Sequence, residues 1–131
     1  MFIDTSGFYC LYNRDQKDHE TAVEFYNSAA RRVTTNYVLA EYVALAGARG
    51  SSRADAIDFS RQVLDDEEIE LIWIDEDLHR QAVRLLAERL DKSYSLCDAA
   101  AFIVMRNLDI AKALTTDRHF KQEGFVRLLE P

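Results

Sequence analysis

The sequence contains little of the material from which long loops and cross-links are made. Its 131 residues include four glycines, two cysteines and one proline, which is the last residue. We therefore expect a single domain over residues 1–131 without a disordered linker. Two cysteines cannot form a disulfide framework. Cys10 and Cys97 each lie in an apolar helical context, which indicates core thiols in a reducing cytoplasm.

Long apolar runs are also missing. No uninterrupted apolar segment approaches the roughly 20 residues that a membrane-spanning helix needs. Met1 leads directly into Phe2, Ile3 and Asp4, without the basic stretch and apolar run of a secretory signal. We therefore expect a cytoplasmic protein that does not associate with a membrane.

Basic residues are outnumbered, because 16 Lys and Arg face 23 Asp and Glu, which gives a net charge of −7. This is the wrong sign for an ordinary nucleic-acid-binding protein, which neutralises phosphates with Lys and Arg. Two interpretations remain open. Either the protein does not bind nucleic acid, or bound cations reverse the charge where the substrate lies.

Short apolar runs alternate with helical patterns along the whole chain. Strands are predicted at residues 2–3, 33–34, 69–74, 110–114 and 125–129. Helices are predicted at residues 6–12, 19–32, 36–49, about 51–64, 75–90 and 95–106. Leu78, Ala82, Leu85, Leu86 and Leu90 share one apolar side of the 75–90 helix. Strands separated by helices predict an α/β fold of three layers, α/β/α, with a central parallel sheet of four to five strands.

Two acids follow predicted strands. Asp4 comes after the first strand, and Asp117 follows Thr115 and Thr116 at the end of the fourth. Each is also a good helix N-cap, so a capping role is the structural alternative for both. Open α/β sheets place their sites beyond the carboxyl ends of the strands, so both acids are candidate site residues.

Two further acids lie on helices expected to begin at the same edge of the sheet. Glu41 is the only charged residue between Asn36 and Arg49, in a helix apolar nearly all round. Such a helix is expected to be largely buried, and a buried carboxylate needs a cation or a hydrogen-bond partner. Asp98 is three residues after Ser95, a capping-box spacing that is compatible with a second role.

Carboxylates gathered in one pocket raise one another's pKa unless a cation compensates them. An all-oxygen site suits Mg²⁺, with Mn²⁺ as the alternative. Zinc is not expected, because His19, His79 and His119 are far apart and neither cysteine has a metal-binding spacing.

The ordered series of these motifs resembles the PIN-domain nucleases over essentially the whole chain. The matching segments are Phe2–Ser6, Thr35–Asn36 with Glu41, Asp91–Ala99, Thr115–Phe120 and Gly124–Phe125. A chain of this length most resembles the VapC-like toxins of toxin–antitoxin pairs. The resemblance implies a PIN-like fold, Mg²⁺-dependent cleavage of RNA, inhibition by a small antitoxin protein and, in many members, a homodimer.

The resemblance also implies roles for particular residues. Asp4, Glu41, Asp98 and Asp117 would be both the catalytic and the metal-binding acids. Ser6 and Thr116 would orient water or substrate. From the residues alone, the cations that can contact phosphate are Arg49, Arg89, Lys92 and Arg118, although each is also explained as a solvated surface charge. An antitoxin groove is predicted along Phe8, Leu11, Tyr12 and Tyr26, for which core packing is the alternative.

Two other functions remain open at this stage. One is a metal-dependent phosphatase or aspartyl-phosphate receiver domain, although Ser6 stands where an aspartyl phosphatase needs a second Asp after Asp4. The other is a non-catalytic PIN-like binding module, for which loss of an acid would be the signature. All four acids are present.

Overall fold

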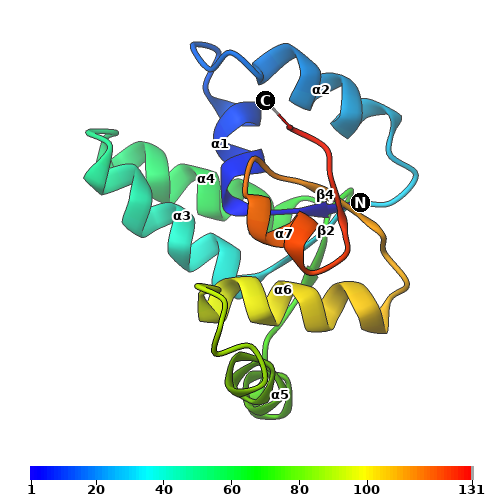
Figure 1. Cartoon of the computed structure of the whole chain (residues 1–131). Helices are drawn as coiled ribbons and strands as arrows, with labels where there is room; N and C mark the ends of the chain where they lie inside the picture. The colour runs from blue at the N-terminus through cyan, green and yellow to red at the C-terminus, as the bar shows by residue number, and fades with distance from the viewer. Residues whose placement is uncertain (131) are drawn as a thin grey trace.

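A computed structural model of the protein describes residues 1–130, in which strands and helices alternate (Figure 1). The strands are β1 (Phe2–Ile3), β2 (Val33–Thr35), β3 (Glu70–Ile72), β4 (Lys112–Leu114) and β5 (Val126–Arg127). The helices are α1 (Thr5–Tyr12), α2 (His19–Ser28), α3 (Asn36–Ala48), α4 (Arg53–Asp65), α5 (Glu76–Ala87), α6 (Leu96–Asn107) and α7 (Arg118–Gln122).

The five strands form one parallel sheet in the order β3-β2-β1-β4-β5. The first strand is central, with Phe2 in register with Val33 of β2 on one side and Ala113 of β4 on the other. Both residues of β1 are fully buried, as expected of a parallel strand covered on two faces. The predicted parallel sheet is confirmed.

Helices cover both sides of the sheet. In Figure 1, α1 and α2 lie on one side and α6 with α5 on the other. Buried aromatic rings fill the interior, and Phe102 lies edge-on to Phe120 with ring centroids 5.0 Å apart. Cys10 and Cys97 are buried and free, as predicted. No helix within residues 1–130 combines the length and apolar character that crossing a bilayer requires.

Several expected boundaries are wrong. Helix α2 ends at Ser28 rather than Arg32, because Ala29 is extended. Helix α5 ends at Ala87, so Leu90 lies in the following turn and is 87% exposed instead of joining the apolar side. Periodicity detects a helical face but does not fix the residue at which the helix stops.

Two burial predictions are also wrong. Beyond Glu41, helix α3 is largely exposed on one side, including Leu45 and Ala48, so it is not buried all round. Phe8 is fully buried against Phe59, with ring centroids 5.1 Å apart, and cannot line a surface groove. Core packing therefore explains Phe8, whereas Tyr12 does reach the surface.

Gly7 allows α1 to lie directly against β4. A Cβ atom at this position would be 2.1 Å from the carbonyl oxygen of Leu114, which is a backbone atom that cannot rotate away. The same carbonyl accepts a hydrogen bond from the backbone N–H of Asp4 at 3.2 Å. A side chain at residue 7 would therefore disturb the segment that positions Asp4.

We expect Gly7→Ala to lower the free energy of unfolding by about 3 kcal/mol, because helix or strand must shift to relieve the overlap. The control is Gly47→Ala in α3, where the added Cβ meets nothing within 4 Å. There the better helix propensity of Ala should raise stability by up to about 1 kcal/mol. Urea unfolding measures both, and equal stability of Gly7→Ala and wild type would contradict this close packing.

Candidate metal centre

The acids that follow β1 and β4 lie at the carboxyl ends of neighbouring strands. Asp4 occupies the N-cap position of α1, yet its side chain makes no capping hydrogen bond. The capping alternative therefore does not explain Asp4. Asp117 does cap α7, because its Oδ1 accepts a hydrogen bond from the backbone N–H of His119 at 2.9 Å. The other carboxylate oxygen of Asp117 is free of that role.

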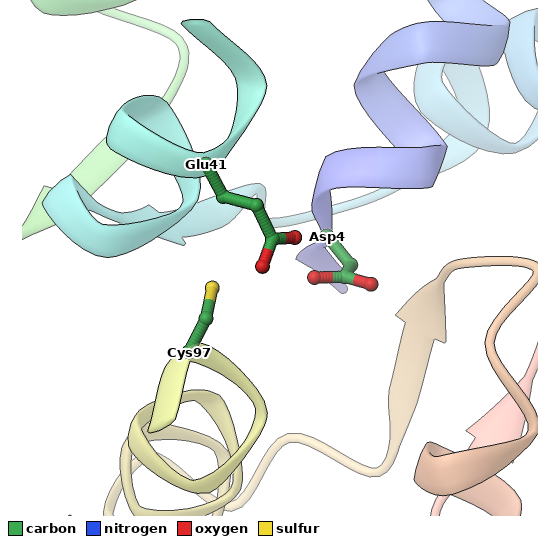
Figure 2. Close-up of side chains that lie close together, drawn as sticks. All are labelled: Asp4, Glu41 and Cys97. Atoms are coloured by element: carbon green, nitrogen blue, oxygen red, sulfur yellow. The ribbon is translucent and has the colours of Figure 1, made fainter. Parts of the chain in front are cut away.

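Asp4 belongs to a cluster built from three elements (Figure 2). One carboxylate oxygen each of Asp4 and Glu41 and the Sγ atom of Cys97 lie within 4.8 Å of one another. Figure 2 shows Glu41 reaching from α3 and Cys97 from α6 toward the side chain of Asp4. Glu41 is half-buried, whereas Asp4 and Cys97 are buried.

A second cluster joins the first residues of α6 to those of α7. Single ligand atoms of Asp98, Asp117 and His119 lie within 4.8 Å of one another. The Nδ1 atom of His119 is 3.0 Å from Oδ2 of Asp98 and 3.3 Å from Oδ1 of Asp117. The predicted capping box is also present, since Asp98 accepts from the backbone N–H of Ser95 and Ser95 Oγ accepts from that of Asp98. Asp98 thus has a capping role and a place in the cluster.

Thr115 connects the two strand ends. Its hydroxyl donates to Oδ2 of Asp4 at 2.9 Å and accepts from the backbone N–H of Asp117 at 3.0 Å. Ser6 Oγ lies 3.1 Å from the same hydroxyl and accepts from the backbone N–H of Thr116. Ser6 is therefore linked to Asp4 through Thr115, and its role toward water or substrate stays a prediction. The hydroxyl that contacts an acid belongs to Thr115, whereas Thr116 takes part through its backbone.

Burial and like charge dominate the electrostatics. Asp4 is 4% exposed, and burial is the main reason that its pKa is raised to about 7. The charges of Asp98 and Glu41 raise it further, while the Thr5 backbone N–H and the Thr115 hydroxyl oppose the shift. Burial likewise raises the pKa of Asp98. The hydrogen bond and the charge of His119 oppose the shift at Asp98 but do not cancel it.

One oxygen atom of Asp4 indicates that the cluster needs a further partner. Oδ1 of Asp4 is buried and has no hydrogen-bond partner within residues 1–130. An unsatisfied buried carboxylate oxygen is costly, and a metal ion is a natural partner for it. The cluster can therefore bind a divalent metal through Asp4 and Glu41.

The four cations predicted to contact phosphate lie in different surroundings. Arg49 lines a pocket of about 160 Å³ whose wall includes Asp4, Glu41 and Asp117, and its guanidinium lies 4.3 Å from the centre of the Tyr9 ring. The remaining three do not line this pocket. Arg89 is paired with Glu123 at 3.0 Å, Lys92 is 3.4 Å from Asp91, and Arg118 is exposed next to Asp117.

Sequence reasoning missed three residues of this centre, namely Cys97, His119 and Thr115. The apolar helical context of Cys97 indicates only a core thiol, and the three histidines are far apart in sequence. A local signal did exist, since each of the three is within two residues of Asp98 or Asp117. This signal does not give the contacts, because adjacent residues on a helix point in different directions: Cys97 belongs to the first cluster and Asp98 to the second.

The raised pKa of Asp4 gives a pH-dependent stability in the metal-free protein. The folded state holds this proton more tightly than the unfolded chain, so the cost appears as pH rises above 3.8 and is complete above about pH 7. A shift of this size corresponds to about 4 kcal/mol. We expect Asp4→Asn, which keeps an acceptor for Thr115, to be more stable than wild type at pH 8 in EDTA.

The difference in stability between Asp4→Asn and wild type should shrink by more than half at pH 5, where Asp4 of the folded wild type keeps its proton. Thermal unfolding of both proteins at the two pH values measures it. Added Mg²⁺ should stabilise wild type and leave Asp4→Asn largely unchanged, because only the former offers the carboxylate. A stability difference independent of pH would show that Asp4 is not the group responsible.

Known proteins are similar to this chain over nearly its whole length. Residues 1–126 match the family model of the PIN domain. The 23S rRNA-specific endonuclease VapC20 of Mycobacterium tuberculosis, in strains CDC 1551 / Oshkosh and H37Rv, is 33% identical over 133 aligned positions, which cover 98% of this chain and 97% of the relative.

The fold is similar to a solved structure as well. A crystal structure of M. tuberculosis VapC20, described as a sarcin–ricin loop cleaving toxin, superposes with a TM-score of 0.87 at 30% identity and covers 99% of this chain and 98% of that one. The family match extends over nearly all of the sequence, and the sheet and helices agree with it. This chain belongs to the PIN-domain family.

Proposed function

We propose that this chain is a Mg²⁺-dependent endoribonuclease, with Mn²⁺ as an alternative ion, and the toxin of a toxin–antitoxin pair. We treat residues 1–131 as one PIN domain that acts in the cytoplasm. The observation that carries the proposal is the buried, unpartnered Oδ1 of Asp4 beside Glu41, at an edge where Asp98 and Asp117 also lie. PIN domains are nucleases, and the centre retains all four acids expected of them.

The acids have distinct positions in this proposal. Asp4 and Glu41 would hold one ion, and Asp98 with Asp117 would hold a second or remove a proton from the attacking water. Thr115 fixes the orientation of Asp4 by donating to its Oδ2. When bound, the metal supplies an activated water and neutralises charge on the leaving oxygen. Positive charge held by these acids would also reverse the local sign of the potential, so that a phosphate could be accommodated in a protein of net charge −7.

Ribosomal RNA is the substrate that we propose. The relatives that align with nearly the whole chain are named as 23S rRNA-specific endonucleases, and the solved structure is described as cleaving the sarcin–ricin loop. The test is cleavage of a labelled 23S rRNA fragment that contains this loop, beside a matched RNA with the loop sequence scrambled. EDTA should stop cleavage and Mg²⁺ or Mn²⁺ should restore it. Hydrolysis of p-nitrophenyl phosphate without RNA cleavage would instead identify a phosphatase.

Two protein partners are part of the proposal. A small antitoxin would dock beside the site, where a groove of about 320 Å³ between α1, α3 and α4 includes Tyr12 and Phe59. A second copy of the chain would cover exposed apolar side chains of the β3–α5 segment, such as Trp73 and Val83. Light scattering should then give the mass of two chains.

Asp98→Asn tests the acids. We expect cleavage to fall by about 1,000-fold or more, because a charged group at the reacting centre is lost. The fold should persist, since Asn still accepts the hydrogen bond from the Ser95 N–H. Asp91→Asn is the control, because Asp91 is exposed and is paired with its neighbour Lys92 on the surface. Gel assays with circular dichroism measure both variants, and full activity of Asp98→Asn would remove this residue from the mechanism.

Arg49→Gln tests the pocket cation. Because Arg49 is the only Lys or Arg among residues 1–130 that lines the pocket, we expect kcat/KM to fall about tenfold, mainly through KM. Arg53→Gln makes the same change of charge on an exposed residue outside the pocket and should have little effect. Equal losses in the two variants would indicate general attraction of RNA rather than a contact at the site.

A further inference from the structure

We propose that Asp4, Glu41 and Cys97 form a mixed oxygen–sulfur site for thiophilic divalent metals such as Zn²⁺. This site overlaps the proposed Mg²⁺ site through the two carboxylates and differs from it by the thiolate. Nothing in the carboxylate chemistry of RNA cleavage requires a sulfur atom at this position. The proposal concerns which metal the centre accepts.

The geometry brings the three donors together from separate parts of the chain. Asp4 comes from the junction of β1 and α1, Glu41 from α3 and Cys97 from the first turn of α6. Their ligand atoms lie within 4.8 Å of one another, and Figure 2 shows the sulfur and both carboxylates directed toward the same space. Donor atoms of tetrahedral zinc are roughly 3.5 Å apart, so a small inward rotation of these side chains completes the site.

An independent observation indicates that the space accepts a cation. Oδ1 of Asp4 is buried and without a hydrogen-bond partner within the described part of the chain, and Asp4 is 4% exposed. Cys97 is itself 9% exposed, but its neighbours are not those of an ordinary core thiol. Burial raises the pKa of this thiol, and the charges of Asp4 and Glu41 raise it further, so the metal-free thiol is neutral.

Whether Sγ of Cys97 acts as a ligand depends on which metal ion binds. Mg²⁺ prefers oxygen ligands and water, so it would use the carboxylates and leave the thiol protonated. Zn²⁺ binds thiolate strongly, as do Co²⁺ and Cd²⁺. Binding of Zn²⁺ forms a Zn–S bond, breaks the S–H bond and releases one proton to solvent, without oxidation or reduction. Three protein ligands then leave one position of the tetrahedron open.

Competition follows, because both kinds of ion need Asp4 and Glu41. If the proposed function is correct, Zn²⁺ displaces Mg²⁺ and inhibits RNA cleavage. This consequence is the one part of the inference that rests on the proposed function. The binding proposal itself does not depend on catalysis. It can therefore be tested without RNA.

Co²⁺ is the probe, since a cobalt–thiolate bond gives a charge-transfer band in the near ultraviolet. We expect metal-free wild type to develop this band with one equivalent of Co²⁺ and to lose it when Zn²⁺ is added. Cys97→Ser should lack the band and bind Co²⁺ at least tenfold more weakly. Cys10→Ser, which removes the other buried thiol, should retain it. Thermal unfolding establishes that both variants are folded.

A second measurement uses wild type alone, in case Cys97→Ser does not fold. Saturating Mg²⁺ should lower the cobalt band if the two ions share carboxylates. Absence of the band in wild type, its persistence in Cys97→Ser, its loss in Cys10→Ser or its indifference to Mg²⁺ would overturn the proposal. The first three results do not bear on Mg²⁺-dependent cleavage of RNA, whose failure would overturn the proposed function separately. Indifference to Mg²⁺ would show that the two ions do not share Asp4 and Glu41.

Discussion

Burial of carboxylates beside one another at one edge of the sheet is the constraint on which this centre depends. Burial raises the pKa of Asp4, the charges of Asp98 and Glu41 raise it further, and its Oδ1 has no hydrogen-bond partner within residues 1–130. Because these acids lie together and Asp4 is buried, the metal-free fold is less stable at neutral pH than at low pH, as far as Asp4 is concerned. A divalent cation would remove this cost, because it would place positive charge beside the buried carboxylate.

Residues of the site also make the hydrogen bonds that begin the neighbouring helices. Asp98 closes the capping box of α6 and Asp117 caps α7, so both carboxylates are held by the helices that they begin. Thr115 joins Asp4 to the backbone of Asp117, and Gly7 lets α1 approach β4 closely enough for this contact. Helix starts, strand ends and ligand positions are therefore parts of one arrangement.

The two clusters differ in their third member, and this difference concerns metal choice. Cys97 adds a sulfur atom beside Asp4 and Glu41, whereas His119 adds a nitrogen atom between Asp98 and Asp117. Four carboxylates alone suit hard cations such as Mg²⁺. The nearby nitrogen and sulfur atoms are ligands that transition metals prefer. Which ion the centre binds would therefore depend on which metals are available.

The sequence by itself determined the strand–helix alternation, the parallel sheet and the acids at the strand ends, because these follow from hydrophobic periodicity and from the motif series that contains Asp4 and Asp117. It did not determine where α5 stops, how much of α3 is exposed, or that Phe8 is in the core. Tertiary structure alone decided that Cys97 would lie beside Glu41, and that Thr115 rather than Thr116 would contact Asp4. Contacts between side chains of different elements depend on packing, and local sequence patterns carry no information about such distances.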